Sequence, residues 1–268
     1  MSRRADDGHG EVGSMAEHSG TLVALVTGGT GGIGMATARK LGERGVLVVL
    51  GDLHPEGGDH AERALAGLRD DGVQCRYVRC DVCSYDDVER TVARIEEEVG
   101  PISILVNNAG IPQATKPLWE LTLDEWDTVV RTNMDSLFYT MKALLPRMVA
   151  RNYGRIVNMS SISGKEGNAR EGAYCATKHG VLGLTKSAAK DVLQYDIRIN
   201  AVCPALINTP LLEGLPQSQI DYFTAKIPLG RLGRAEEVAD MVAFLALSEA
   251  VDFITGMAFD VSGGRADY

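Results

Sequence analysis

The sequence of 268 residues contains no long hydrophobic run and no excess of positive charge. Its longest apolar stretches, such as Leu22–Val26 and Leu47–Leu50, are far shorter than the roughly 20 residues that a membrane-spanning helix needs. Lys and Arg number 27 against 36 Asp and Glu, which gives a formal net charge of −9. The short apolar runs argue against a membrane as partner. The acidic charge argues against a nucleic acid, because phosphate binding needs clustered Lys and Arg.

Cysteines are few as well, and the five present form an odd, irregular set. Cys80 and Cys83 have CxxC spacing, but no second pair or suitably spaced histidines accompany them, so we expect no metal site. We interpret the cysteines as small buried side chains of a protein that works in a reduced, cytoplasmic setting. Residues 1–20 lack the apolar core of a secretory signal and are expected to form a disordered leader before one domain over residues 21–268.

Short apolar runs alternate with helix-like segments along the chain. Near-continuous apolar strands separated by helices predict a parallel sheet that is covered on both faces. We therefore predict an α/β fold, a single doubly wound domain of Rossmann type with a seven-stranded parallel sheet flanked by helices. Ligands of such sheets bind beyond the carboxyl ends of the strands. The expected strands are residues 21–27, 46–50, 73–79, 102–106, 155–159, 197–202 and 257–261.

A glycine-rich segment, residues 27–34, follows the first expected strand and opens a helix. Gly28, Gly32 and Gly34 meet the demands of a pyrophosphate site, which needs a tight turn and a close backbone approach at a helix N-terminus. No Lys-Ser or Lys-Thr follows, so this is not a Walker A loop. The alternative is a flexible turn without a ligand. We expect a dinucleotide to contact Gly28, Thr30, Gly31, Gly32, Ile33 and Gly34.

The second expected strand ends in Asp52, eighteen residues after Gly34. An acidic residue about 20 residues past the glycine turn binds the ribose hydroxyls of adenosine. Its charge would repel a 2′-phosphate, and no Lys or Arg stands in the glycine loop or directly after Asp52. NAD is therefore favoured over NADP as cofactor. The alternative is that Asp52 only caps the turn that follows.

With the spacing Gly28-x-x-x-Gly32-x-Gly34, the chain resembles the short-chain dehydrogenase/reductase family over residues 21–264. Three further motifs of that family follow expected strands in the same order, and Ala205 stands where the family has Gly. The resemblance implies that Thr209, with backbone help from Ile207, binds the nicotinamide carboxamide. It implies further cofactor contacts at Asp81, Val82, Asn108, Ala109, Gly110, Tyr174, Lys178 and Pro204.

The same resemblance implies a catalytic tetrad of Asn133, Ser161, Tyr174 and Lys178. Tyr174 and Lys178 stand four residues apart, which places them on one face of a helix. The ordinary pKa of Tyr is about 10, and a nearby cation favours the phenolate. Tyr174 would act as general acid and base, Ser161 would bond the substrate oxygen, and Asn133 would hold a water that links Lys178 to solvent. Ser160 is the alternative to Ser161, and the family's spacing selects Ser161.

These residues imply an NAD(H)-dependent oxidoreductase that interconverts a secondary alcohol and a ketone. One alternative is an NADP(H)-dependent ketoreductase of the 3-oxoacyl type. Another is a non-catalytic dinucleotide-binding sensor, which predicts a damaged tetrad. A nucleotide-sugar epimerase also uses a YxxxK pair, but it needs a larger C-terminal domain than the 94 residues that follow Tyr174.

Residues 162–173 and 206–227 are expected to enclose the substrate, the second segment as a mobile lid. Charged and amide side chains in the first segment predict a polar substrate such as a sugar, cyclitol or hydroxy acid. Alternatively these side chains face solvent, and the apolar residues of the lid would suit an apolar ketone. The resemblance also implies a homotetramer built through two long helices, whose apolar residues are Leu137, Phe138, Met141, Leu144, Val181, Leu182 and Leu184.

Overall fold

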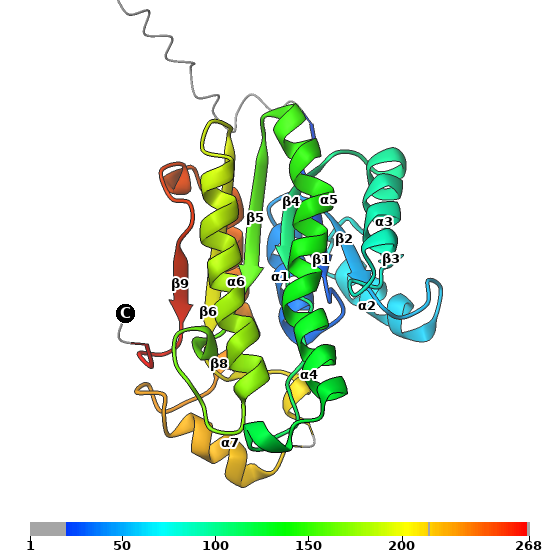
Figure 1. Cartoon of the computed structure of the whole chain (residues 1–268). Helices are drawn as coiled ribbons and strands as arrows, with labels where there is room; N and C mark the ends of the chain where they lie inside the picture. The colour runs from blue at the N-terminus through cyan, green and yellow to red at the C-terminus, as the bar shows by residue number, and fades with distance from the viewer. Residues whose placement is uncertain (1–19, 214, 267–268) are drawn as a thin grey trace, which may run out of the picture.

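Seven parallel strands form the central sheet of the protein, in the order β3-β2-β1-β4-β5-β6-β9 (Figure 1). This computed structural model describes residues 20–213 and 215–266, so residues 1–19 of the expected leader lie outside the described residues. The predicted seven-stranded α/β fold is confirmed, and each strand overlaps a predicted run. The strands are β1 (Val23–Thr27), β2 (Leu47–Asp52), β3 (Cys75–Arg79), β4 (Ile102–Asn107), β5 (Gly154–Met159), β6 (Ile197–Pro204) and β9 (Ala258–Val261).

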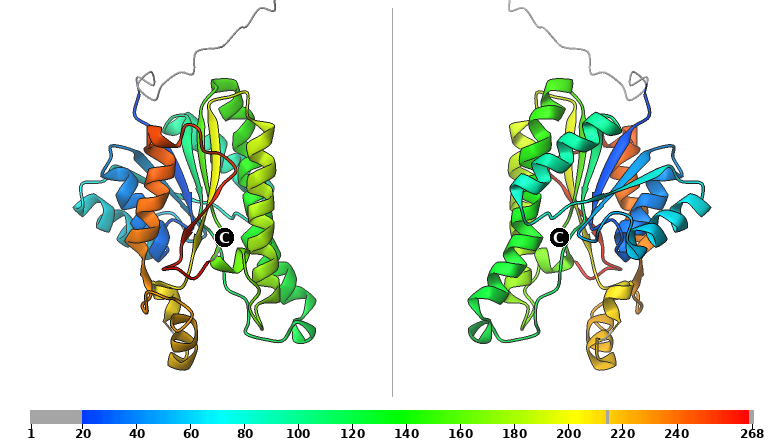
Figure 2. Two further views of the ribbon diagram at one scale, coloured as in Figure 1. Left: turned by 90° about the vertical axis from the view of Figure 1, so that its left-hand side faces the viewer. Right: turned by 90° about the vertical axis from the view of Figure 1, so that its right-hand side faces the viewer.

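Helices cover both faces of this sheet, as the two side views show (Figure 2). One face carries α1 (Gly32–Gly42), α2 (Asp59–Asp70) and α8 (Ala235–Leu247), and the other carries α3 (Tyr85–Glu98), α5 (Ser136–Arg151) and α6 (Gly172–Asp191). The shorter α4 (Leu123–Val130) and α7 (Gln217–Thr224) lie beyond the carboxyl ends of the strands (Figure 1).

Alternation along the strands divides the core into two layers. In β1, Val23 and Leu25 pack with α3, α5 and α6, whereas Ala24 and Val26 pack with α1 and α8. All four side chains are at most 3% exposed, which is why the run is apolar throughout rather than alternating with polar residues. Full burial of one Val or Leu side chain contributes about 1.5–3 kcal/mol, so these layers are the main source of stability.

The strand order of the sheet determines where a ligand is expected to bind. The chain runs outward from β1 through β2 to β3 and then returns to β4 on the other side of β1. The carboxyl ends of β1 and β4 are therefore the switch point at which doubly wound sheets bind their ligands. No helix in the described part of the chain is long and apolar enough to cross a membrane.

A second sheet of two short strands was not predicted. β7 (Ile207–Asn208) pairs in parallel with β8 (Gly233–Arg234) and joins the two ends of the segment that contains α7. Its strands are too short to leave a periodic pattern in the sequence. Ile207 of β7 packs into the core and is 6% exposed. This sheet anchors the base of the expected lid.

The helices expected to build a tetramer turn mostly toward the protomer's own core. Four of the seven apolar residues named for that interface are buried within the protomer, and Phe138 is 48% exposed. The buried four are Leu137, Met141, Leu144 and Val181.

Candidate active site

A cleft of about 660 Å³ lies at the carboxyl ends of β1, β2, β3 and β4. It therefore occupies the switch point of the sheet. Five residues of the predicted cofactor set are outside its lining, namely Gly34, Tyr174, Lys178, Pro204 and Ile207. Those that line it are Gly28, Thr30, Gly31, Gly32, Ile33, Asp52, Asp81, Val82, Asn108, Ala109, Gly110 and Thr209.

The glycine turn is packed so closely that a side chain at Gly28 or Gly34 would clash with neighbouring backbone. Gly28 has φ +59°, and a Cβ there would lie 2.9 Å from Ala109 Cα. A Cβ on Gly34 would overlap the carbonyl oxygen of Gly28, so Gly34 lets the first turn of α1 approach the loop. Gly31 is the N-cap of α1 and gives no side-chain cap to its amides. This bare helix N-terminus beside the cleft fits the pyrophosphate of a dinucleotide.

Asn108 holds the glycine turn against β4. Its side-chain amide donates to the carbonyl oxygens of Thr27 at 3.0 Å and of Gly28 at 2.9 Å. The Thr27 hydroxyl accepts from the backbone N–H groups of Asn108 and Ala109, each at 3.1 Å. The donor groups of Asn108 are thus used within the protein, which indicates that this residue shapes the cleft as well as lining it.

Asp52 ends β2 and lines the cleft. Its Oδ2 accepts from the backbone N–H and the hydroxyl of Thr30, at 3.1 and 2.5 Å. Its Oδ1 accepts from the backbone N–H of Leu53 at 2.8 Å. No cationic side chain of the described chain forms an ion pair with this carboxylate, so its negative charge stays available at the cleft wall.

Lys178 and Asn133 are buried together beside Gly110. A Cβ on Gly110 would lie 3.3 Å from Asn133 Oδ1 and 3.6 Å from Lys178 Nζ. Because Gly110 also lines the cleft, the cleft and the tetrad meet at this glycine. Lys178 is 4% exposed, and its Nζ donates to the carbonyl oxygen of Met159 at 2.9 Å. Burial lowers the pKa of Lys178 to about 8.

Asn133 lies in a π-helical turn, η3 (Arg131–Asp135), between α4 and α5. Its side chain accepts from the N–H of Ile111 and donates to the carbonyl oxygen of Ile111, both at 2.8 Å. It therefore fastens the chain that follows Gly110. Such π-turns occur often at functional sites, where they redirect a side chain out of the regular helix.

Tyr174 stands in the first turn of α6, and the Nζ of Lys178 lies 5.6 Å from the centre of its ring. Burial raises the pKa of Tyr174 to about 12, and hydrogen bonding to Ser161 opposes this rise. Ser161 follows β5, and its Oγ accepts from the N–H of Ser163 at 3.1 Å. Ser160 instead donates to the carbonyl oxygen of Lys178 at 2.9 Å, a structural bond that leaves Ser161 as the serine beside Tyr174.

The polar side chains of residues 162–173 mostly bind other parts of the protein. Lys165 pairs with Asp260 at 2.9 Å, and Glu166 pairs with Arg265. The Oδ1 of Asn168 accepts from Lys226 at 3.1 Å and from Arg265 at 3.2 Å. Arg170 is exposed. The segment is thus tied to the lid and to the C-terminal tail, and the alternative that its charges face solvent describes only part of it.

Several residues near the cofactor cleft or the tetrad escaped the sequence analysis. For most of them the signal was a position at or just after a strand. The exceptions are His60 of α2, Thr132 of the π-helical turn, and Gln113, whose Oε1 accepts from the N–H of Tyr174 at 2.9 Å. The other overlooked lining residues are Gly51, Leu53, His54, Cys80, Cys83, Ile111, Thr132, Pro210 and Leu211.

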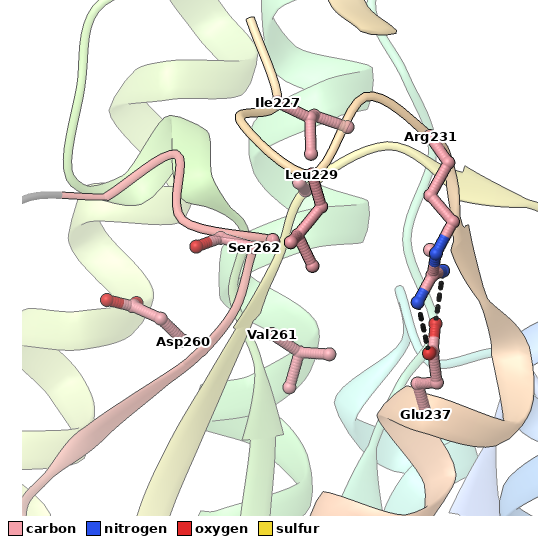
Figure 3. Close-up of a pocket in the computed structure, with 10 residues that line it drawn as sticks. Ile227, Leu229, Arg231, Glu237, Asp260, Val261 and Ser262 are labelled. Atoms are coloured by element: carbon pink, nitrogen blue, oxygen red, sulfur yellow. Dashed lines mark hydrogen bonds and ion pairs between the residues drawn. The ribbon is translucent and has the colours of Figure 1, made fainter.

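A smaller hollow of about 220 Å³ opens beside the end of β9 (Figure 3). Arg231 and Glu237 lie together on one side of it, joined by two bonds of 3.0 and 2.7 Å, and this pairing lowers the pKa of Glu237 to about 2. No predicted site residue lines this hollow, and its two strongest charges neutralise each other. The larger cleft is therefore the candidate cofactor site.

The parallel sheet, the glycine turn and the carboxylate that ends β2 together define a dinucleotide-binding enzyme of Rossmann type. The family model described as enoyl-(acyl carrier protein) reductase matches residues 28–266. The chain belongs to the short-chain dehydrogenase/reductase family, which confirms the resemblance found in the sequence. It is an NAD(P)-dependent oxidoreductase acting on CH–OH groups.

Two relatives and one solved structure show how close these similarities are. The chain is 44% identical over 250 residues to cis-4-hydroxycyclohexanecarboxylate dehydrogenase of Sinomonas cyclohexanicum, covering 93% of this chain and 98% of the relative. It is 41% identical over 245 residues to 2-dehydro-3-deoxy-L-rhamnonate dehydrogenase (NAD(+)) of a Sphingomonas species, covering 91% and 95%. The crystal structure of an actinorhodin polyketide ketoreductase variant with NADPH superposes with a TM-score of 0.86 at 37% identity, covering 92% and 98%.

Proposed function

We propose that this enzyme is an NAD(H)-dependent dehydrogenase that interconverts the secondary alcohol and the ketone of a small hydroxy acid. The observation that carries the proposal is the meeting of the cofactor cleft with Asn133 and Lys178 at Gly110. A dinucleotide in the cleft would thus place its reactive end beside the tetrad. When bound, that cofactor supplies or accepts the hydride.

The four residues of the tetrad have separate roles in substrate binding and proton transfer. Tyr174 takes the alcohol proton during oxidation and returns it during reduction. Ser161 bonds the substrate oxygen and stabilises the charge that develops on it. Lys178 places a positive charge near the Tyr174 ring, which favours the phenolate. Because the amide of Asn133 is bonded to Ile111, we assign it the task of fixing the chain beside Lys178, where a relay water would pass the proton to solvent.

The preference for NAD rests on Asp52. Its carboxylate lines the cleft and would accept hydrogen bonds from ribose hydroxyls, whereas a 2′-phosphate would meet like charge at close range. The relative from Sphingomonas is named as an NAD(+) enzyme, which supports the same choice. Toward the nicotinamide end, Thr209 packs its side chain against Gly32 at the cleft wall.

A hydroxy acid is favoured by the charges around residues 162–173. Lys226 and Arg265 converge on one neutral acceptor, Asn168 Oδ1, near the half-buried Glu171. In the described chain Lys226 forms no ion pair, so its Nζ can still donate to a carboxylate. Both relatives carry names of carboxylate substrates, a rhamnonate and a cyclohexanecarboxylate.

A panel of secondary alcohols with NAD+ tests this proposal, with NADH absorbance as the readout. We expect turnover of hydroxy acids, and a higher KM for them in Lys226→Met with little change for neutral alcohols. The carboxamide of each acid serves as the matched control substrate, because it keeps the shape and loses the charge. Turnover of hydrophobic ketones alone would contradict the proposal.

A second candidate is an NADP(H)-dependent ketoreductase of the 3-oxoacyl type. It is favoured by the structural similarity to the polyketide ketoreductase with NADPH and by the exposed Leu211, Leu215 and Tyr222 of the lid. A higher kcat/KM with NADPH than with NADH, on a 3-oxoacyl thioester, would select this candidate.

For the assembly we propose a homotetramer in the cytoplasm. Exposed aromatic side chains on the protomer support association, namely Phe138 on α5, Phe244 on α8 and the fully exposed Phe253. Light scattering at micromolar concentration should give the mass of four chains, and a monomer would refute the proposal.

A further inference from the structure

Two histidines at the adenosine end of the cleft take no part in the function proposed above. His54 follows β2, and His60 is the second residue of α2. Both line the cleft beside Asp52. Their rings pack together with centroids 3.9 Å apart and an interplanar angle of 34°. This contact fixes the position of the His60 ring on the cleft wall.

His60 reaches Asp52 through the hydroxyl of Thr30. The Nε2 of His60 lies 2.9 Å from Thr30 Oγ1, which in turn lies 2.5 Å from Asp52 Oδ2. The three residues come from three different elements, the helix α2, the glycine turn and the strand β2. Thr30 is therefore the middle member of a chain of hydrogen bonds across the cleft wall.

The directions of these bonds follow from the protons available. A threonine hydroxyl has one proton, and an ionised carboxylate can only accept. Thr30 must therefore donate to Asp52, which leaves Thr30 Oγ1 as an acceptor for His60. His60 then has to carry a proton on Nε2, so the neutral ring is the Nε2–H tautomer.

We propose that His60 is a positioning residue which, through Thr30, orients the Asp52 carboxylate and so sets the discrimination between NAD and NADP. Three protein donors bond to the Asp52 carboxylate: the backbone N–H and the hydroxyl of Thr30, and the backbone N–H of Leu53. About four acceptor sites are available on a carboxylate, so its plane is set before any ligand arrives. A free site then faces the cleft, where it can take a ribose hydroxyl.

This inference rests on the proposed function, because it assigns adenosine ribose to the site beside Asp52. Removal of the His60 donor leaves the Thr30 hydroxyl bonded to Asp52 alone, so one of the three donors that orient the carboxylate is less firmly held. The change acts on cofactor binding and leaves the tetrad untouched. It should therefore alter the KM for NAD+ and leave kcat nearly constant.

Two substitutions separate this role from a merely structural one. His60→Leu removes the donor, whereas His60→Gln keeps an N–H group at a reach similar to Nε2. For His60→Leu we expect the KM for NAD+ to rise about three- to tenfold, with an equal loss of NAD+ over NADP+ preference, as for one hydrogen bond in a charged network. His60→Gln should recover most of that loss. Equal cofactor preference in wild type and His60→Leu, or a Gln variant as impaired as Leu, would overturn the inference.

Nitrogen-15 NMR of the histidine side chains gives an independent readout on the full-length protein without cofactor. We expect the His60 ring to show the Nε2–H pattern, and an Nδ1–H pattern would overturn the hydrogen-bond chain. Titration of the protein with NADH tests the proposed function separately from the His60 tautomer. A wild-type protein that fails to bind NADH would refute the proposed function, while the tautomer still decides whether His60 donates to Thr30.

Discussion

Lys178 and Tyr174 form a preassembled pair, in which the lysine Nζ lies 5.6 Å from the centre of the tyrosine ring. The lysine is held there by the carbonyl oxygen of Met159, at the end of β5. Burial favours the neutral form of both groups. It raises the pKa of Tyr174 to about 12 and lowers the pKa of Lys178 to about 8. Without cofactor, the tyrosine therefore keeps its proton at neutral pH.

This protonation state predicts different pH profiles for the two directions of the reaction. Oxidation requires the phenolate, whose fraction rises tenfold per pH unit below the pKa of Tyr174 of about 12. We expect kcat/KM for oxidation to rise from pH 6 toward pH 8 and then to bend, because Lys178 loses its charge around pH 8. Reduction uses the protonated phenol and should not rise over this range. An oxidation rate that falls between pH 6 and 8 would contradict the assignment.

Removal of the lysine charge tests the origin of that bend. Lys178→Met keeps an unbranched chain in the buried site and removes the cation that favours the phenolate. We expect kcat for oxidation to fall about 10²-fold or more, and the bend near pH 8 to disappear from the profile. The pH dependence of kcat/KM, measured beside wild type, checks both effects. A variant that keeps the bend would show that another group produces it.

Substitution of Asp52 should change the cofactor preference. Asp52→Asn keeps an oxygen that can accept from Thr30 and removes the negative charge that opposes a 2′-phosphate. We expect the ratio of kcat/KM for NAD+ over NADP+ to fall about 10- to 100-fold, which corresponds to roughly 1.4–2.7 kcal/mol. The measurement compares both cofactors on one substrate. An unchanged ratio would place the discrimination elsewhere in the cleft.

Two glycines of the phosphate turn should respond differently to alanine. A Cβ on Gly34 would overlap the Gly28 carbonyl oxygen, so Gly34→Ala should destabilise the protein by about 1–3 kcal/mol. Gly31 has φ −72°, and its Cβ would meet nothing closer than 3.4 Å. Gly31→Ala should therefore keep the stability within about 0.5 kcal/mol and weaken NADH binding instead.

Urea unfolding and NADH titration on both variants separate packing from ligand contact. If Gly34→Ala unfolds at the same urea concentration as wild type, the close approach of α1 to the glycine turn is not required for folding.

The sheet could be predicted because its strands obey one simple constraint. Val23 to Val26 are apolar on both faces since helices cover both, and runs of this kind need no knowledge of tertiary contacts. The residues at and just after the strand ends could be predicted as well, because the parallel order brings the carboxyl ends of the strands to one edge of the sheet. Asp52 and Gly110 are examples, and both line the cleft.

What could not be predicted depends on contacts between distant segments. β7 pairs with β8 only after the intervening lid folds back, and the π-turn at Asn133 is fixed by Ile111, 22 residues away. His60 shows the same limit, since its bond to Thr30 spans 30 residues and leaves no local pattern. The polar character of residues 162–173 was visible, but its pairing with Lys226 and Arg265 was not.

Tyr174→Phe tests the central claim most directly, because it removes one hydroxyl and keeps the buried ring. NADH formation from NAD+ and the best alcohol of the panel should fall about 10²- to 10⁴-fold, the range that general acid–base catalysis contributes. NADH binding, followed by fluorescence titration, should stay within about twofold of wild type, since the hydroxyl acts in the chemical step. Turnover equal to that of wild type, with NADH binding intact, would contradict the assignment of Tyr174 as the proton-transferring residue.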